Sequence, residues 1–239
     1  MQVLALSSSR VGGGAYLSAA LPLIQNFLGG EAKRIAFVPF ATADNDYEGY
    51  GTNVRQALAS LPHTVDLVTP ENARNTVVNS DVLMVGGGNT FKLLHDIYSQ
   101  DLFTLMLQKV AGGTPYIGWS AGANLAGKTI CTTNDMPIIQ PQSFTAFGFF
   151  PFQLNPHYYN VLIEGFHGET RDQRLQEFLL VNPGVPVIGL PEGSALLLQN
   201  ENLRYCGTQE AVLFQWGGEE SKPAKTALAP DADLAYLLA

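Results

Sequence analysis

The chain has 239 residues, of which 46% are hydrophobic and 14% are charged, and its formal net charge is −8. This length and composition are typical of one compact globular domain and exclude a disordered tether. The acidic balance, without any cluster of lysines or arginines, argues against a nucleic acid or an anionic membrane surface as a partner.

Short β-rich segments bounded by turn residues alternate along the chain with segments of helical spacing. The predicted strands are Val3–Leu6, Ile35–Phe40, Thr64–Val68, Asp81–Val85, Pro115–Trp119 and Val187–Leu190. The predicted helices, whose apolar residues recur three and four apart, are Leu17–Leu28, Asn53–Leu61, Phe91–Tyr98 and Leu102–Val110. Because the strands are apolar on both faces, the alternation predicts a three-layer α/β fold with a mostly parallel sheet flanked by helices.

The pattern changes after Ser194. Short strands predicted at Ala195–Gln199, Leu203–Tyr205 and Ala211–Trp216 indicate an antiparallel C-terminal extension at an edge of the sheet. We expect residues 1–218 to form a single α/β domain, with 219–239 as a loosely attached tail rich in alanine, proline and aspartate. A long polar loop is expected at 42–51.

The segment Gly118–Gly122 follows an apolar strand and leads into a helix, with Ser120 on the turn between them. This strand–turn–helix pattern is the sequence form of a nucleophile elbow and favours a serine hydrolase. The glycines leave room for a strained backbone, and the helix start offers N–H groups to an oxyanion beside Ser120. The alternative is an ordinary tight turn, since glycine and serine are common turn residues.

A serine nucleophile needs a base, and four histidines compete for that role. His63, in a turn, and His95, within a helix, are interpreted as surface or packing residues. His157 follows Pro156, which fixes the chain just before the imidazole, and is favoured modestly over His167.

The carboxylate that orients the base has two candidates. Glu192 stands at the carboxyl end of a predicted strand, where a buried acid needs a partner such as an imidazole. Asp135 lies in a polar turn that could face the same cleft, or could satisfy its own backbone there. The residues alone leave both open.

Two further segments could bind an anion. Gly86–Asn89 connects a strand to a helix, and its three consecutive glycines expose backbone N–H groups that suit an oxyanion hole, although close loop packing explains them as well. Arg171, between Glu169 and Asp172 near a predicted helix start, could pair with a substrate carboxylate.

Together these segments resemble the peptidase E family of cytoplasmic serine peptidases, which cleave dipeptides with an N-terminal aspartate. The motifs that carry the resemblance are Val85–Phe91, Tyr116–Ala126, Thr132–Pro137, Asn155–His157, Gly168–Arg171 and Gly189–Gly193, in the order of the family. The resemblance extends from the first strand to about Trp216. It implies a fold like that of the class I glutamine amidotransferases, with serine in place of their cysteine at the elbow.

The resemblance also implies roles for single residues. Ser120 is the expected nucleophile and His157 its base, with Glu192 favoured over Asp135 for orienting the ring. Asp135 would then hold His157 indirectly or meet the α-ammonium group of the substrate. Gly88 and the N–H of Ala121 form the expected oxyanion hole, and Arg171 with Asn89 binds the substrate, Arg171 taking the aspartyl side chain.

Cofactor and partner expectations follow from the same resemblance. No metal or other cofactor is required, the partner is a small dipeptide substrate, and the chain is expected to be a monomer or homodimer. No apolar run reaches the roughly 20 residues of a membrane-spanning helix, and the N-terminus lacks the features of an export signal, so a cytoplasmic protein is expected. Cys131 and Cys206 lack metal-ligand spacing and are expected to pack as small apolar residues.

Two other functions remain as alternatives. One is a cyanophycinase-like peptidase that acts on β-aspartyl substrates, although its elbow usually lacks a tryptophan like Trp119. The other is a non-catalytic binding protein on the same fold, in which the glycine loop and the elbow survive only as architecture.

Overall fold

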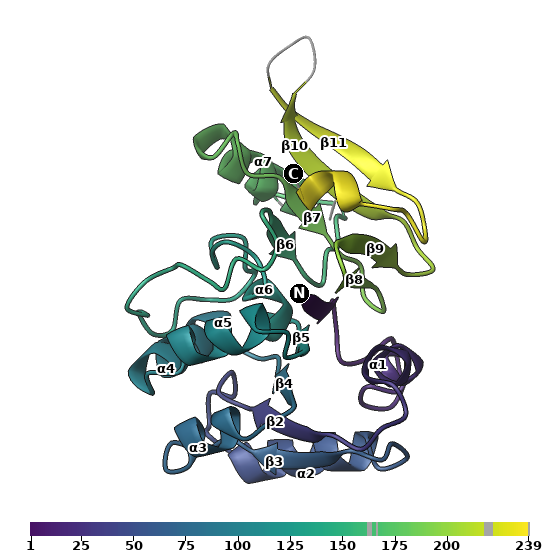
Figure 1. Cartoon of the computed structure of the whole chain (residues 1–239). Coiled ribbons are helices and arrows are strands. Elements are labelled where there is room, and N and C mark those ends of the chain that lie inside the picture. The colour runs from purple at the N-terminus through teal and green to yellow at the C-terminus, as the bar shows by residue number, and fades with distance from the viewer. Residues whose placement is uncertain (162–163, 166, 218–221, 239) are drawn as a thin grey trace.

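The computed structural model describes residues 1–161, 164–165, 167–217 and 222–238, which form two sheets covered by helices (Figure 1). The larger sheet has seven strands in the order β3-β2-β4-β5-β1-β8-β9. Its strands are β1 (Gln2–Leu6), β2 (Arg34–Val38), β3 (Thr64–Leu67), β4 (Val82–Val85), β5 (Tyr116–Trp119), β8 (Ala195–Gln199) and β9 (Asn202–Cys206). The first five strands run parallel, and β8 and β9 are antiparallel. The mostly parallel sheet and the antiparallel C-terminal strands are therefore confirmed.

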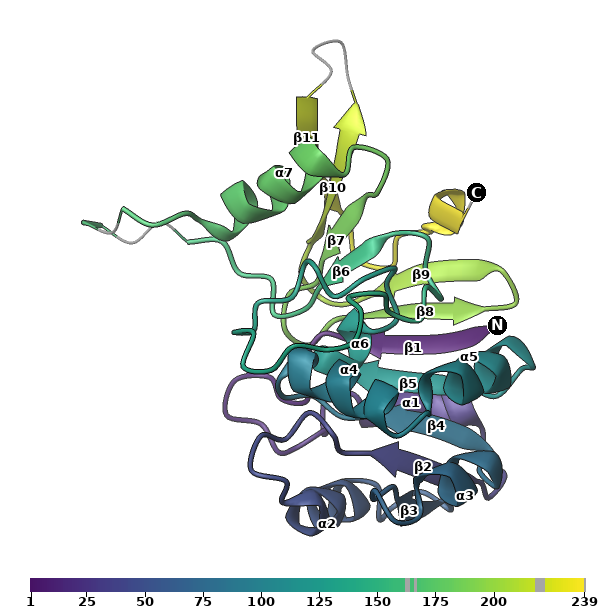
Figure 2. The same ribbon diagram turned by 90° about the vertical axis from the view of Figure 1, so that its left-hand side faces the viewer.

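Helices cover both faces of this sheet (Figure 1), and one of these faces is turned toward the viewer in Figure 2. α1 (Leu21–Leu28) and α2 (Tyr47–Ala57) lie on one face, and α3 (Ala73–Val78), α4 (Thr90–Ser99), α5 (Phe103–Ala111) and the short α6 (Ala121–Asn124) lie on the other. Successive side chains of β1 point to opposite faces of the sheet, which shows why a layer of helices is needed on each face. Leu4 and Leu6 pack in the core with α1 and α2, whereas Val3 and Ala5 pack in the core with α4 and α5.

A second sheet stands beside the first, with strands in the order β11-β10-β7-β6. Its members are β6 (Gln153–Asn155), β7 (Val187–Gly189), β10 (Ala211–Gly217) and β11 (Lys222–Leu228). One face of this sheet joins the larger core through Leu154 and Ile188, and the other face packs Val187 against Leu179 of α7 (Arg171–Val181). A 3-10 turn, Ala235–Leu238, follows β11.

Several elements differ from the sequence prediction. The strand predicted at 187–190 and the one at 211–216 belong to the second sheet, not to the main one. The region 42–51 is only partly loop, because α2 begins at Tyr47, where the Asp46 side chain caps the helix by accepting a hydrogen bond from the Gly49 N–H at 2.9 Å. Helix α1 begins at Leu21, since Leu17 has a φ of 55°.

The tail contributes a full strand, with Lys222–Leu228 pairing along the whole of β10. The predicted boundary between 218 and 219 lies outside the described residues. Cys206 is half-buried against the core as expected, but Cys131 is exposed. Within the described ranges, no helix has both the length and the apolarity needed to cross a bilayer.

Candidate active site

Ser120 occupies a sharp, strained turn between β5 and α6. Its φ of 53° and ψ of −111° are uncommon for a residue with a side chain. A Cβ atom on Gly118 would lie 2.4 Å from the Gly122 carbonyl oxygen, and one on Gly122 would lie 2.3 Å from the Val85 carbonyl oxygen. The turn therefore requires glycine on both sides of Ser120, as in a nucleophile elbow.

The glycine loop between β4 and α4 lies directly against this turn. A Cβ atom on Gly87 would be 2.9 Å from the Cβ of Ser120. Gly88 has a φ of +135°, and a Cβ atom there would be 2.4 Å from the Ala41 carbonyl oxygen. Among the described residues, the N–H groups of Gly88 and Ala121 donate to no protein acceptor. Two free backbone donors thus flank the Ser120 turn, which is the arrangement an oxyanion requires.

His157 and Glu192 meet at the ends of neighbouring strands of the second sheet. Their parallel strands pair Asn155 of β6 with Gly189 of β7, so the turns that follow leave the sheet at the same edge. The Nδ1 atom of His157 lies 2.9 Å from Oε1 of Glu192. A carboxylate on Nδ1 leaves the other ring nitrogen free to accept a proton.

The end of β1 connects the serine turn to the histidine. The Ser120 N–H donates to the Leu6 carbonyl at 3.1 Å, and the next residue, Ser7, accepts a hydrogen bond from the His157 N–H at 2.9 Å. The buried Ser7 hydroxyl in turn donates to the Leu190 carbonyl at 2.8 Å. Although no hydrogen bond joins the Ser120 hydroxyl to the His157 ring in the described part of the chain, their backbones are held by two consecutive residues, the last residue of β1 and Ser7 after it.

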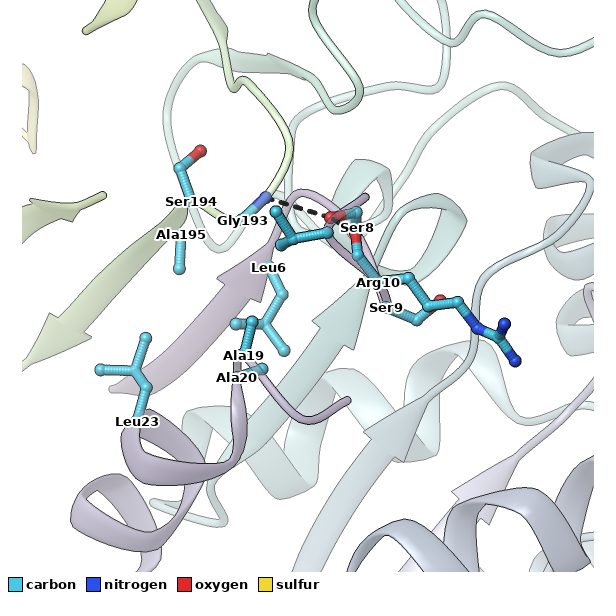
Figure 3. A pocket seen from close by; sticks show the side chains of 11 residues that line it. Leu6, Ser8, Ser9, Arg10, Ala19, Ala20, Leu23, Gly193, Ser194 and Ala195 are labelled. Carbon is cyan, nitrogen blue, oxygen red and sulfur yellow. Dashed lines mark hydrogen bonds between the residues drawn. The ribbon is translucent and has the colours of Figure 1, made fainter. Parts of the chain in front are cut away.

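Hydrogen bonds hold the turn that carries Glu192. The Gly193 N–H donates to the Ser8 hydroxyl at 3.1 Å (Figure 3). The Ser194 hydroxyl donates to the Pro191 carbonyl at 2.6 Å. A cavity of about 30 Å³ lies between this turn, Arg10 and Leu23. That volume corresponds to roughly one water molecule, so this cavity is too small to hold a dipeptide.

The structure places Asp135 at the start of α4. Its Oδ2 atom accepts hydrogen bonds from the Thr90 N–H at 2.8 Å and from the Thr90 hydroxyl at 2.6 Å. The preceding Asn134 donates from Nδ2 to the Pro156 carbonyl at 2.8 Å, one residue before His157. Asp135 thus contacts the helix that follows the glycine loop, whereas Glu192 contacts the His157 ring.

Asn89 caps α4 and holds the same loop. Its Oδ1 atom accepts from the Lys92 N–H at 3.0 Å, and its Nδ2 atom donates to the Met136 carbonyl at 2.8 Å. Both polar atoms of this side chain are therefore engaged within the protein. Its predicted contact with substrate stays a prediction.

Arg171 begins α7 and has a free donor. Its Nη1 atom is buried and has no hydrogen-bond partner among the described residues. Burial lowers the pKa of Arg171 below its usual value, and the charge of neighbouring Arg174 lowers it further, whereas Tyr158 acts in the opposite direction. Both causes of the lowered pKa reflect a cation without a compensating anion, which a bound carboxylate would supply.

The other histidines lie apart from these groups. His167 is exposed in the segment before α7, and His95 of α4 places its Nδ1 atom 2.8 Å from Oδ1 of Asp96. The ring nitrogens of His63 are buried without a partner among the described residues, in the turn before β3. Of the four histidines, only His157 has its ring within hydrogen-bond distance of a candidate orienting carboxylate, in the part of the chain that the structure describes.

Sequence reasoning did not single out Ser7 or Tyr50, which both contact the site. Ser7 directly follows β1 at the carboxyl edge of a parallel sheet, so the rule that sites lie at that edge could have found it. Tyr50 lies on α2 within the region expected to be a loop, and no motif marks it.

Comparisons with known proteins identify a family of peptidases and the same fold. The model of peptidase family S51 matches residues 3–206. A peptidase E of Shewanella amazonensis is 45% identical over 239 residues, covering 100% of this chain and 99% of the relative, and a peptidase E of Nostoc sp. is 43% identical over 92% of each chain. A crystal structure described as a peptidase E from Listeria monocytogenes has a TM-score of 0.65 at 21% identity, covering 85% of this chain and 96% of that one, which shows the same fold.

Proposed function

This chain belongs to peptidase family S51, and we propose that it is a serine dipeptidase that releases aspartate from the N-terminus of dipeptides. The observation that supports it most is the convergence of Ser120, on its strained elbow, with the His157–Glu192 pair and the two free N–H donors. In support of this, Ser120 follows β5, the glycine loop follows β4, and the His157–Glu192 pair follows two neighbouring strands of the second sheet. A peptidase needs a nucleophile, a base and an oxyanion site, and each has a candidate here.

The proposed mechanism is acyl transfer through Ser120. His157 takes the hydroxyl proton as Ser120 attacks the carbonyl carbon of the aspartyl residue, and the resulting oxyanion accepts hydrogen bonds from Gly88 and Ala121. The imidazolium then protonates the departing amine as the peptide bond breaks. Water, deprotonated by His157, hydrolyses the acyl-enzyme and releases free aspartate. Glu192 holds the ring in the tautomer that these transfers require.

Arg171 is the proposed partner of the aspartyl side chain. A carboxylate at its buried, unpartnered Nη1 atom would offset the desolvation that lowers the pKa of this guanidinium. Because the backbone of Arg171 is held at the start of α7, a glutamyl carboxylate, longer by one methylene, would displace the scissile bond from Ser120. Selectivity for aspartate over glutamate follows.

The proposed function is tested by free amino-acid release from four dipeptides, Asp-Leu, Glu-Leu, Leu-Asp and β-Asp-Leu. We expect rapid cleavage of Asp-Leu alone. Cleavage of β-Asp-Leu in preference would assign the chain to β-aspartyl substrates, and no cleavage of any of the four would refute the dipeptidase.

Replacing Arg171 by methionine should remove the charge while keeping most of the packing of the side chain. We expect Arg171→Met to lower kcat/KM for Asp-Leu by about 10²- to 10³-fold, because an ion pair with a desolvated carboxylate is lost. For Asn-Leu, which has the same shape without the charge, the decrease should be much smaller. The matched control is Arg174→Met on the same helix. Equal losses on both substrates would remove Arg171 from the recognition of aspartate.

A further inference from the structure

Tyr50 lies at the centre of a hydrogen-bonded group behind the elbow. Its hydroxyl donates to the Gly87 carbonyl at 3.0 Å and accepts from the indole Nε1–H of Trp119 at 3.0 Å. The Tyr16 hydroxyl donates to the Tyr50 hydroxyl oxygen at 3.2 Å. With one donor and two acceptor positions filled, the Tyr50 hydroxyl has little freedom to rotate away from Gly87.

The carbonyl that Tyr50 contacts belongs to the peptide unit that carries the Gly88 N–H. This peptide bond is trans, so its C=O and N–H point in opposite directions from one rigid plane. Fixing the carbonyl on the Tyr50 side therefore fixes the N–H on the other side. A hydrogen bond to the carbonyl also polarises the amide and makes its N–H a stronger donor.

Glycines cannot hold this plane themselves. Gly86, Gly87 and Gly88 have the widest backbone freedom of any residue type, and Gly88 sits at a φ of +135°. The Tyr50 ring is locked in place by edge contacts, with centroids 5.0 Å from Phe37 and 6.5 Å from Trp119. The ring is thus a rigid support for a flexible loop.

Trp119 links the same support to the nucleophile. It directly precedes Ser120, is fully buried, and stacks on Phe37 with a centroid distance of 5.8 Å. The Tyr50 hydroxyl accepts a hydrogen bond from the indole N–H of Trp119 and donates one to the Gly87 carbonyl. This hydroxyl therefore sets the spacing between the elbow and the glycine loop.

We propose that Tyr50 is a positioning residue that, through its hydroxyl, orients the Gly87–Gly88 peptide so that the Gly88 N–H faces the oxyanion formed at Ser120. The proposal rests on the proposed serine mechanism. Tyr50 would act on the transition state, because negative charge develops on the carbonyl oxygen as the tetrahedral intermediate forms and is absent from the bound substrate.

The test is Tyr50→Phe, which keeps the ring and removes the hydroxyl. We expect kcat for Asp-Leu to fall by about 10-fold with KM changed by less than about 2-fold, since weakening an oxyanion donor costs less than deleting one. The matched control is Tyr47→Phe on the same helix, whose hydroxyl donates to Asn45 and makes no contact with Gly87. That variant should keep the wild-type kcat.

A second measurement does not depend on activity. The chain has two tryptophans, so the indole N–H signal of Trp119 can be assigned by NMR in uniformly ¹⁵N-labelled protein. It should move and exchange faster with solvent in Tyr50→Phe but not in Tyr47→Phe.

The outcomes separate the two proposals. A wild-type protein that does not cleave Asp-Leu refutes the proposed function, whatever Tyr50 does. If the wild-type protein cleaves Asp-Leu, three results would overturn the Tyr50 proposal: Tyr50→Phe keeps the wild-type kcat, it raises only KM, or it leaves the indole signal of Trp119 unchanged.

Discussion

Replacing Ser120 by alanine is expected to lower kcat for Asp-Leu by roughly 10⁴-fold or more. Without the hydroxyl no acyl-enzyme forms, and the oxyanion donors alone can assist only a slow attack by water. Stability should change little, because the residue at 120 keeps its strained φ of 53° and only one oxygen atom is removed. Activity is measured by amino-acid release and the fold by thermal unfolding.

The control for Ser120→Ala is Ser99→Ala, which removes the hydroxyl of an exposed serine that donates to the His95 carbonyl on α4. It should retain wild-type activity. Substantial Asp-Leu cleavage by Ser120→Ala, in a preparation free of other peptidases, would contradict a serine nucleophile at this position.

Replacing Glu192 by glutamine is expected to lower kcat for Asp-Leu by roughly 10²-fold with little change in stability. The carbonyl oxygen of glutamine can still accept from Nδ1, but the charge that stabilises the imidazolium is gone. The side chain of Glu192 is 53% exposed, so solvent screens part of that charge and moderates the loss. The readouts are kcat for Asp-Leu and the thermal midpoint.

The matched variant is Asp135→Asn, which makes the same chemical change in the other candidate carboxylate. Its charge lies at the N-terminus of α4 and on Thr90, so its loss should lower the free energy of unfolding by about 1 kcal/mol. The kcat for Asp-Leu should fall less than in Glu192→Gln, because the substitution acts on activity only by loosening the glycine loop. A larger kcat loss in Asp135→Asn without a stability change would exchange the two roles.

Much of the fold could be predicted because local patterns and the final structure agree. Buried runs such as Val82–Val85 are apolar at every position, as strands covered on both faces must be. The second sheet could not be predicted in this way. Val187–Gly189 is equally apolar and buried, and nothing in a buried strand states which sheet it will join. β6 has only three residues, Gln153–Asn155, and is too short for a periodic signal.

In the candidate site too, residues marked by a local pattern could be predicted from the sequence, and residues distinguished only by distant partners could not. Ser120 and the glycines beside it were predicted because a strained turn restricts the residues that can occupy it. The choice between Glu192 and Asp135 was open, because both acids follow polar or strand-end turns and only their partners distinguish them. Those partners, His157 and Thr90, are distant in sequence. Tyr50 was missed because a supporting hydroxyl has no spacing rule.

The most direct test of the central claim is the reaction of the active protein with a fluorophosphonate, which modifies activated serines, followed by mapping of the modified peptide by mass spectrometry. The proposed mechanism predicts one label per chain, on Ser120, with loss of Asp-Leu cleavage in proportion to labelling. Full inactivation with the label on another residue, or full activity after stoichiometric labelling of Ser120, would contradict it.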